Sequence, residues 1–282
     1  METTGSTASA RPTGKPPTGT PHTHSALRLA ALSWFTAATI GQLAFVWMIL
    51  AHYGRTTLSG QMAHWNDKPL IKGFVAGDST GNLMFAVHVL LAAAVTLGGL
   101  AQLVPAIRRQ APYLHRWIGR SFFAIACVMA LNGLWLTWVR HTYLSVISGL
   151  AVSMDGILIL IFSALAWRHA LARDLPAHRR WALRAFLVVN GVWFLRIGMM
   201  AWVLITGGGL GMNRTLSGPA DIVLQYGAYL IPLAILEVYF AGQQSHSAKA
   251  VSLAAALVFC AAAITLLGTG GAIAFMWGPY MM

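Results

Sequence analysis

Four ionisable side chains stand inside long apolar stretches of the sequence: His88, Asp155, Arg196 and Glu237. An ionised group in the hydrocarbon of a membrane costs about 2.5 to 3.5 kcal/mol on insertion scales, so each one needs a partner or a purpose. Asp155 and Arg196 fall at similar depths in neighbouring stretches, which makes an ion pair between them possible. Such a pair either locks two helices together or lets Arg196 hold an anion while Asp155 orients it. Glu237 is expected to reach the membrane interface.

Two amides lie in the same kind of surroundings. Asn132 and Asn190 stand within apolar stretches, where an amide needs hydrogen-bond partners. Either they line a cavity together with Arg196, or they form hydrogen bonds between helices. The sequence leaves both alternatives open.

A seven-residue pattern, Arg-Trp-x-x-Arg-x-Phe, occurs at residues 116–122 and again 64 positions later at 180–186. On a helix its two arginines lie one turn apart on one face, and a histidine stands just before each copy. Cations beside aromatic rings are typical of a helix that starts at the cytoplasmic surface of a membrane. We therefore predict a site for an anion or a lipid headgroup at His115, Arg116, Arg120, His178, Arg180 and Arg184.

The histidines suggest a second chemistry, since paired imidazoles from neighbouring helices hold haem iron in membrane cytochromes. Nineteen residues separate His88 from Ile107, a rise of about 28 Å. His88 therefore cannot share an iron with His115. It could pair with His52 or His141 near one surface, while His115 could pair with His178 near the other. No other metal site is expected.

The composition identifies an integral membrane protein. Hydrophobic residues make up 57% of the 282-residue chain and charged residues 9%, against roughly 25% charged in an ordinary soluble domain. The net charge of +12 does not indicate nucleic-acid binding, because the cations stand in short segments between apolar runs. Cys127 and Cys260 lie within apolar runs and give no redox or zinc signal.

Seven apolar runs are long enough to cross about 30 Å of hydrocarbon as helices. The fold class is therefore an all-α bundle of seven transmembrane helices, near residues 27–52, 82–107, 117–139, 144–167, 181–206, 220–240 and 250–276. Residues 1–26, rich in Thr, Gly, Ser and Pro, are predicted to be a disordered tail, with 27–282 as the transmembrane domain. The tail and the even-numbered loops carry thirteen Lys and Arg, and the odd-numbered loops carry five. This asymmetry places the amino terminus in the cytoplasm.

Several short motifs together resemble a known family. They are His88, Gly98-Gly99-Leu100-Ala101-Gln102, Leu114-His115-Arg116-Trp117-Ile118-Gly119-Arg120, His178-Arg179-Arg180-Trp181-Ala182-Leu183-Arg184 and Leu195-Arg196. In this order they resemble the bacterial membrane proteins grouped as domain of unknown function 2306, over residues 82–200. The chain departs from that pattern at Phe122, where the family usually has tyrosine, and at Ala182, where it usually has methionine. The resemblance implies a multi-pass protein of the bacterial inner membrane and no particular activity.

Three functions remain open. The first is the binding or transport of a small anionic or lipid-like ligand by the Arg and His groups, with the bilayer and its anionic headgroups as partners. The second is a membrane redox protein that binds haem or quinone. The third is a structural or assembly subunit of a membrane complex. The chain shows no P-loop, zincin motif or nucleophile elbow, and whether it is an enzyme, and which oligomer it forms, stay undecided.

Overall fold

The computed structural model describes residues 21–68 and 72–281, and this part of the chain is helical without strands. Six helices are long and apolar enough to cross a membrane, and a bent pair of shorter helices passes the same test when its two halves are taken together, which gives up to seven spans. The predicted all-α membrane bundle is therefore confirmed. The six are α1 (Pro21–Met48), α3 (Ser79–Leu103), α5 (Pro112–Trp138), α6 (Val146–Leu171), α9 (Pro219–Gln244) and α10 (Ala248–Gly271).

The first span begins earlier than the sequence indicated. Helix α1 starts at Pro21, whereas the tail was predicted to reach residue 26. The difference arises because residues 23–26 contain no proline or glycine to stop the helix. The rest of the predicted tail, residues 1–20, lies outside the described residues.

The fifth span is the bent one. Helix α7 (Leu175–Val189) and helix α8 (Gly191–Thr206) meet at 55° with Asn190 between them. The Asn190 side chain donates from Nδ2 to the carbonyl oxygen of Phe186 at 2.8 Å, within its own turn. A hydrogen bond of this local kind competes with the regular helix and favours an end at this position.

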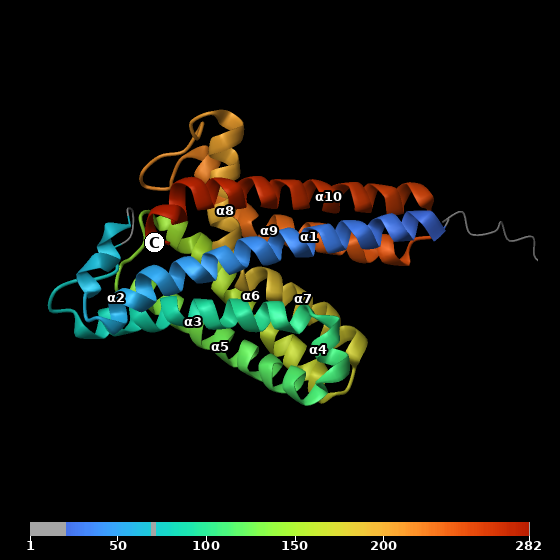
Figure 1. Ribbon diagram of the computed structural model, residues 1–282, viewed down its shortest axis with the longest axis horizontal. Helices are drawn as coiled ribbons and strands as arrows, with labels where there is room; N and C mark the ends of the chain where they lie inside the picture. The colour runs from blue at the N-terminus through green and yellow to red at the C-terminus, as the bar shows by residue number, and fades with distance from the viewer. Residues whose placement is uncertain (1–20, 69–71, 282) are drawn as a thin grey trace, which may run out of the picture.

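Helices α1 and α10 lie side by side over most of their length (Figure 1). Each continues into a π-helical segment, η1 (Ile49–Gly54) after α1 and η3 (Ala272–Trp277) after α10. After η1 the chain forms the short helices α2 (Arg55–Leu58) and η2 (Met62–Asp67). After η3 it forms the short helix η4 (Gly278–Tyr280). Phe45 contacts Trp277 and His52 contacts Tyr280, with ring centres 5.4 and 4.9 Å apart.

The remaining spans form a second group. Helices α3 and α5 pack together below α1 in Figure 1, and α6 packs against both α5 and α7. The short helix α4 (Pro105–Gln110) connects α3 to α5. Helix α8 crosses α10 so closely that a methyl group on Gly268 would collide with the carbonyl oxygen of Ile197. Small residues permit this kind of close packing in membranes.

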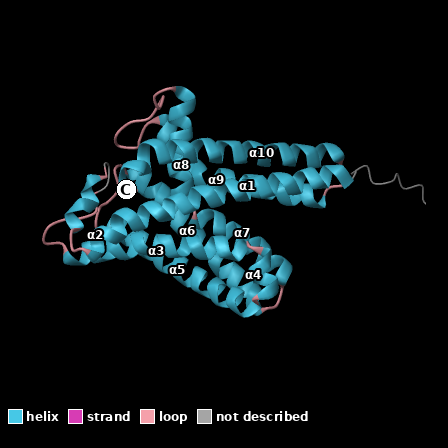
Figure 2. Cartoon of the chain, viewed as in Figure 1, coloured by secondary structure: helices cyan, strands magenta, loops and turns pink. Residues whose placement is uncertain are grey.

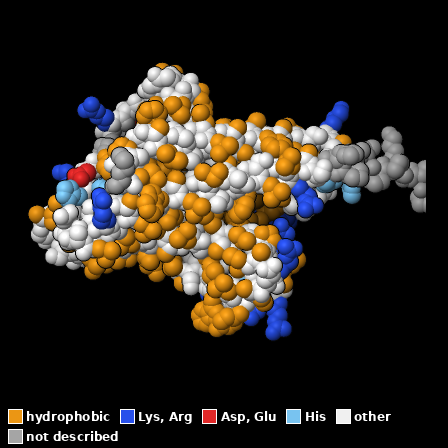
Figure 3. All heavy atoms as spheres, viewed as in Figure 1, with side chains coloured by type: hydrophobic (Ala, Val, Ile, Leu, Met, Phe, Trp, Pro, Cys, Tyr) orange, Lys and Arg blue, Asp and Glu red, His pale blue; other side chains and the backbone are white. Residues whose placement is uncertain are grey.

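The connectors lie at the ends of the helices (Figure 2). We call the end where α5, α7 and α10 begin the basic end, because its connectors and first helical turns hold Arg108, Arg109, Arg116, Arg173, Arg179 and Lys249. Large apolar side chains stay exposed along the long helices, for example Leu83, Ile157, Ile231 and Leu266. Figure 3 shows hydrophobic side chains spread over the flanks of the molecule, as expected for a surface that faces lipid.

Candidate functional site

Arg196 is a half-buried cation of helix α8. Its guanidinium carbon lies 5.3 Å from the centre of the Phe45 ring on α1, and Nη1 donates to the Val192 carbonyl oxygen at 3.2 Å. The ion pairs found among residues 21–68 and 72–281 do not include it. The guanidinium thus keeps most of its donors without an acidic partner.

Three other polar side chains interact electrostatically with Arg196. His88 on α3 and Tyr53 on η1 lie within its electrostatic reach, as does Lys68 from the connector after η2. The Lys68 ammonium lies 4.3 Å from the centre of the Tyr280 ring and 3.5 Å from the sulfur of Met48. Burial and, to a smaller extent, the positive charge of the nearby Arg196 together lower the pKa of Lys68 to about 8. The π-helical segments therefore border a region where positive charge gathers.

The expected ion pair between Asp155 and Arg196 is not formed. The Asp155 carboxylate lies directly against Gly191, the first residue of α8. Arg196 follows Gly191 by five residues, which places it about 140° further around the helix after a full turn. The two groups therefore face different neighbours, and Asp155 does not orient Arg196.

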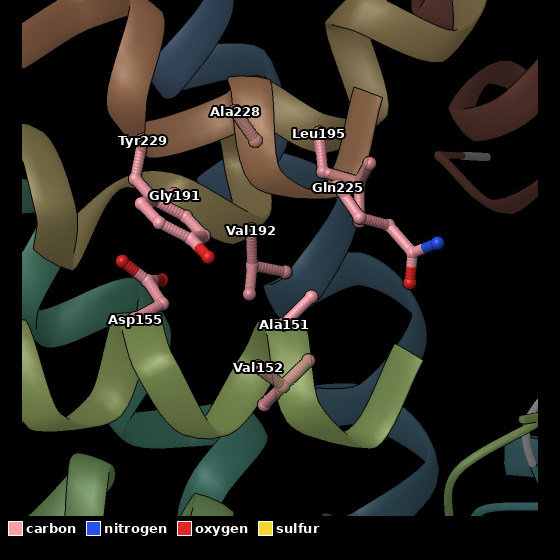
Figure 4. Close-up of a pocket in the computed structure, with 9 residues that line it drawn as sticks. All are labelled: Ala151, Val152, Asp155, Gly191, Val192, Leu195, Gln225, Ala228 and Tyr229. Atoms are coloured by element: carbon pink, nitrogen blue, oxygen red, sulfur yellow. The ribbon is translucent and has the colours of Figure 1, made fainter. Parts of the chain in front are cut away.

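Asp155 instead lines a small cavity between α6, α8 and α9 (Figure 4). The side chain is 7% exposed, and its Oδ1 has no hydrogen-bond partner among the described residues. Tyr229 of α9, 2% exposed, points its hydroxyl toward the carboxylate, and that hydroxyl is also without a partner there. These are two unpaired polar groups at one place in the bundle.

The two amides and Glu237 have hydrogen-bond partners within the bundle. Asn132 on α5 donates from Nδ2 to the Met84 carbonyl oxygen of α3 at 3.1 Å, which is a hydrogen bond between helices. Asn190 bonds within its own helix, as described above. Glu237 of α9 accepts from both Nε and Nη2 of Arg184 at 2.7 and 2.9 Å. Arg184 thus joins α7 to α9.

The two copies of the repeated pattern have the same local geometry. Arg120 lies over the Trp117 ring at 5.3 Å, and Arg184 lies over the Trp181 ring at 4.6 Å. The two phenylalanines that end the copies meet on one residue of α3: a methyl group on Gly99 would come within 3.0 Å of ring carbons of both Phe122 and Phe186.

The other residues of the predicted anion site at the basic end lie in or beside the two repeats. Gln102 on α3 donates to the His115 carbonyl oxygen at 2.9 Å. Arg180 lies over Phe240 at 4.8 Å, a contact from α7 to α9. Arg116 stands in the first turns of α5 and is exposed. The motifs on α3, α5 and α7 thus assemble around Gly99 into one packed cluster.

The structure gives each of the predicted histidines its own neighbours. His115 and His178 lie within electrostatic reach of each other at the basic end, and His178 forms a hydrogen bond through Nδ1 with the Ala166 carbonyl oxygen at 2.9 Å. His88 packs on Gly133.

His52 and His141 contact aromatic rings. His52 packs against Tyr53 and Tyr280, and His141 packs against Tyr143. None of these contacts joins two histidines. In the part of the chain that the structure describes, no group of three His, Cys, Asp or Glu side chains has metal-site geometry.

Arg140 forms a hydrogen-bond network at the end opposite the basic end, which was not predicted from the sequence. Arg140 donates to the Asp78 carboxylate at 2.9 Å, to the Gly73 carbonyl oxygen at 3.0 Å and to Asn82 Oδ1 at 2.7 Å. The hydrogen bond from the Gly81 amide and the Arg140 side chain both lower the pKa of Asp78. The sequence offers one signal for this network, since an aspartate directly before a helix is a typical N-cap.

An apolar groove of about 510 Å³ lies between α5 and α6 near the basic end. Its walls include Phe123, Trp167 and Leu171, and Arg168 stands among them. A groove of this kind has room for an acyl chain beside a cation.

The helices, their apolar flanks and the buried polar groups define a polytopic helical membrane protein. Residues 85–240, more than half of the chain, match the family described as "Predicted membrane protein (DUF2306)". The chain belongs to this family, as its motifs suggested. Neither a curated protein nor a solved structure matches it.

Proposed function

We propose that this chain is a multi-pass protein of a bacterial cytoplasmic membrane that binds a small anion at Arg196 and carries it across. The observation that carries the proposal is a half-buried guanidinium inside a span with no acidic partner among the described residues. A cation so placed is costly without a counter-charge, and an anionic ligand supplies one.

The neighbours of Arg196 support an anion rather than a cation as ligand. Lys68 adds a second positive charge, and His88 and Tyr53 add polar groups that can donate hydrogen bonds. Asp67, the acidic residue next to Lys68 in the chain, lies 3.0 Å from His64 and so has a partner of its own. A guanidinium recognises carboxylate or phosphate oxygens with two parallel hydrogen bonds, which favours these two ligand classes.

The orientation and the lipid partners belong to the same proposal. The excess of Lys and Arg at the basic end favours the cytoplasm for that end, so Arg196 is reached from the other side. Arg168 beside the apolar groove and the Arg-Trp pairs of the repeats suit anionic lipid headgroups of the cytoplasmic leaflet.

The test is anion binding by the purified protein in detergent, measured by calorimetry with phosphate, sulfate and succinate as probes. Arg196→Gln is expected to weaken the binding of the best probe by about 10- to 100-fold, because a charged hydrogen bond contributes about 1.5 to 3 kcal/mol. The matched control is Arg214→Gln, which removes one positive charge from an exposed loop residue.

Binding that survives Arg196→Gln, or a wild-type protein that binds none of the three probes, contradicts the proposal. If Arg196→Gln does not assemble, Arg196→Lys keeps the charge but loses the paired donors. Unchanged anion affinity in Arg196→Lys would also contradict the proposal. An absorption spectrum of the same sample tests the haem alternative, which a reduced haem band would favour.

A further inference from the structure

The cavity beside Asp155 is separate from the Arg196 region, and its volume determines what it can hold. Its volume is about 20 Å³, and the side chains around the polar pair include Ala151, Val152, Val192 and Leu195. A cavity needs about 10 to 15 Å³ to hold one water molecule, and that water needs polar partners. This cavity therefore has room for one water.

Two polar atoms that face the cavity are available to that water. Asp155 Oδ1 and the Tyr229 hydroxyl are buried without partners among the residues described, and both point into the same space in Figure 4. The amide nitrogen of Gln225, another residue of the wall, is already bonded to the carbonyl oxygens of Leu216 and Asp221. One water between the carboxyl and the phenol would satisfy both groups.

The charges around Asp155 decide its protonation. Tyr229 is the titratable group that faces it from α9, while α8 contributes Gly191, Val192 and Leu195, and Arg196 faces elsewhere. Burial without a cation favours the neutral acid. The first turn of α8, which begins against the carboxyl, favours the anion. The two effects act in opposite directions on the protonation of this carboxyl.

We propose that Asp155 and Tyr229 form a proton-binding site, in which the Asp155 carboxylate takes up one proton from water and returns it through the single water of the cavity. The reaction transfers one proton and changes no oxidation state. Because the carboxyl lies at the break between α7 and α8, each transfer changes the charge against the helix that carries Arg196. The site stands independently of the anion proposal, since it rests on different residues.

Infrared difference spectroscopy of the purified protein in lipid tests the site. The wild type is expected to show a carboxylic-acid C=O band that Asp155→Asn removes, that titrates with pH and that shifts in D₂O. Tyr229→Phe is expected to move the band without removing it, because the water loses one partner. The control is Asp221→Asn: Asp221 is buried too, but its carboxylate accepts hydrogen bonds from the amides of Asn213 and Gly218, so the band is expected to stay.

Three results would overturn the proposal. They are an acid band that Asp155→Asn leaves intact, a band that never shifts in D₂O because the carboxyl is sealed from water, and a band that sodium ions abolish at constant pH, which would indicate a cation site. If Asp155→Asn does not assemble, the test is whether Tyr229→Phe moves the carboxylic-acid band away from its wild-type position. A band that stays at the wild-type position in Tyr229→Phe then overturns the proposal.

Discussion

Individual arginines of this chain differ in how their charge is compensated. Arg140 has three hydrogen-bond acceptors, and Arg184 has both oxygens of Glu237. Both arginines tie separate segments together. Arg196 has one carbonyl oxygen and an aromatic ring, and no acidic partner among the described residues. Of these three arginines, Arg196 is the one whose charge an anionic ligand would neutralise.

Lys68 is expected to make anion binding depend on pH. Burial and then Arg196 lower its pKa to about 8, so the lysine is cationic below that pH and neutral above it. The affinity of the wild type for its best anion should therefore fall as the pH rises through about 8. Titrations on either side of that value test this.

Two lysine substitutions test this prediction, one at Lys68 and one at Lys72 as the control. Lys68→Met should bind more weakly and lose the pH step, whereas Lys72→Met, at an exposed position, should keep it. An identical pH profile in Lys68→Met would show that Lys68 does not contribute to the site.

At the scale of the helices, the irregular segments gather around the candidate sites. The π-helical segments η1 and η3 border the Arg196 region, and the break between α7 and α8 adjoins Asp155. Irregular helical turns of this kind are frequent at functional sites. Regular packing is concentrated elsewhere, as in the cluster around Gly99.

The contact between α8 and α10 gives a matched pair of glycine substitutions. Gly268→Ala should destabilise the protein by roughly 1 to 3 kcal/mol, because the new methyl group collides with the Ile197 backbone and α8 must move away. A methyl group on Gly270, two residues along the same helix, meets no atom within 4 Å, so Gly270→Ala should leave stability unchanged or slightly higher. Thermal unfolding in detergent measures both, and equal effects would refute the predicted close contact.

For the whole molecule, the number and direction of the spans can be tested by cysteine labelling. On a background with Cys127 and Cys260 replaced, we place single cysteines at Ala172, between α6 and α7, and at Leu210, beyond α8; both positions are exposed. In intact cells an impermeant maleimide should label Leu210→Cys, and it should label Ala172→Cys only after permeabilisation. The opposite pattern would reverse the orientation. Labelling of both from one side would show that the bent pair does not cross the membrane.

The membrane class, the helical fold and most of the span boundaries follow from the sequence alone. Helix length and apolar content are local properties, and a lipid environment leaves few alternatives for the backbone. The family also follows, because its motifs are contiguous stretches such as residues 114–120 and 178–184. By contrast, the sequence missed the bend at Asn190, since an asparagine in an apolar run is compatible with a continuous helix.

Only the tertiary structure decided which polar groups meet. Asp155 is buried and Arg196 is half-buried, and the rotation of α8 gives them different neighbours. Arg184 finds Glu237 and Arg140 finds Asp78 across separations of 53 and 62 residues. Such pairings depend on the rotation and crossing of whole helices, which the packing of many side chains sets together. The cavity of Asp155 and Tyr229 arises in the same way, from three helices that meet at one point.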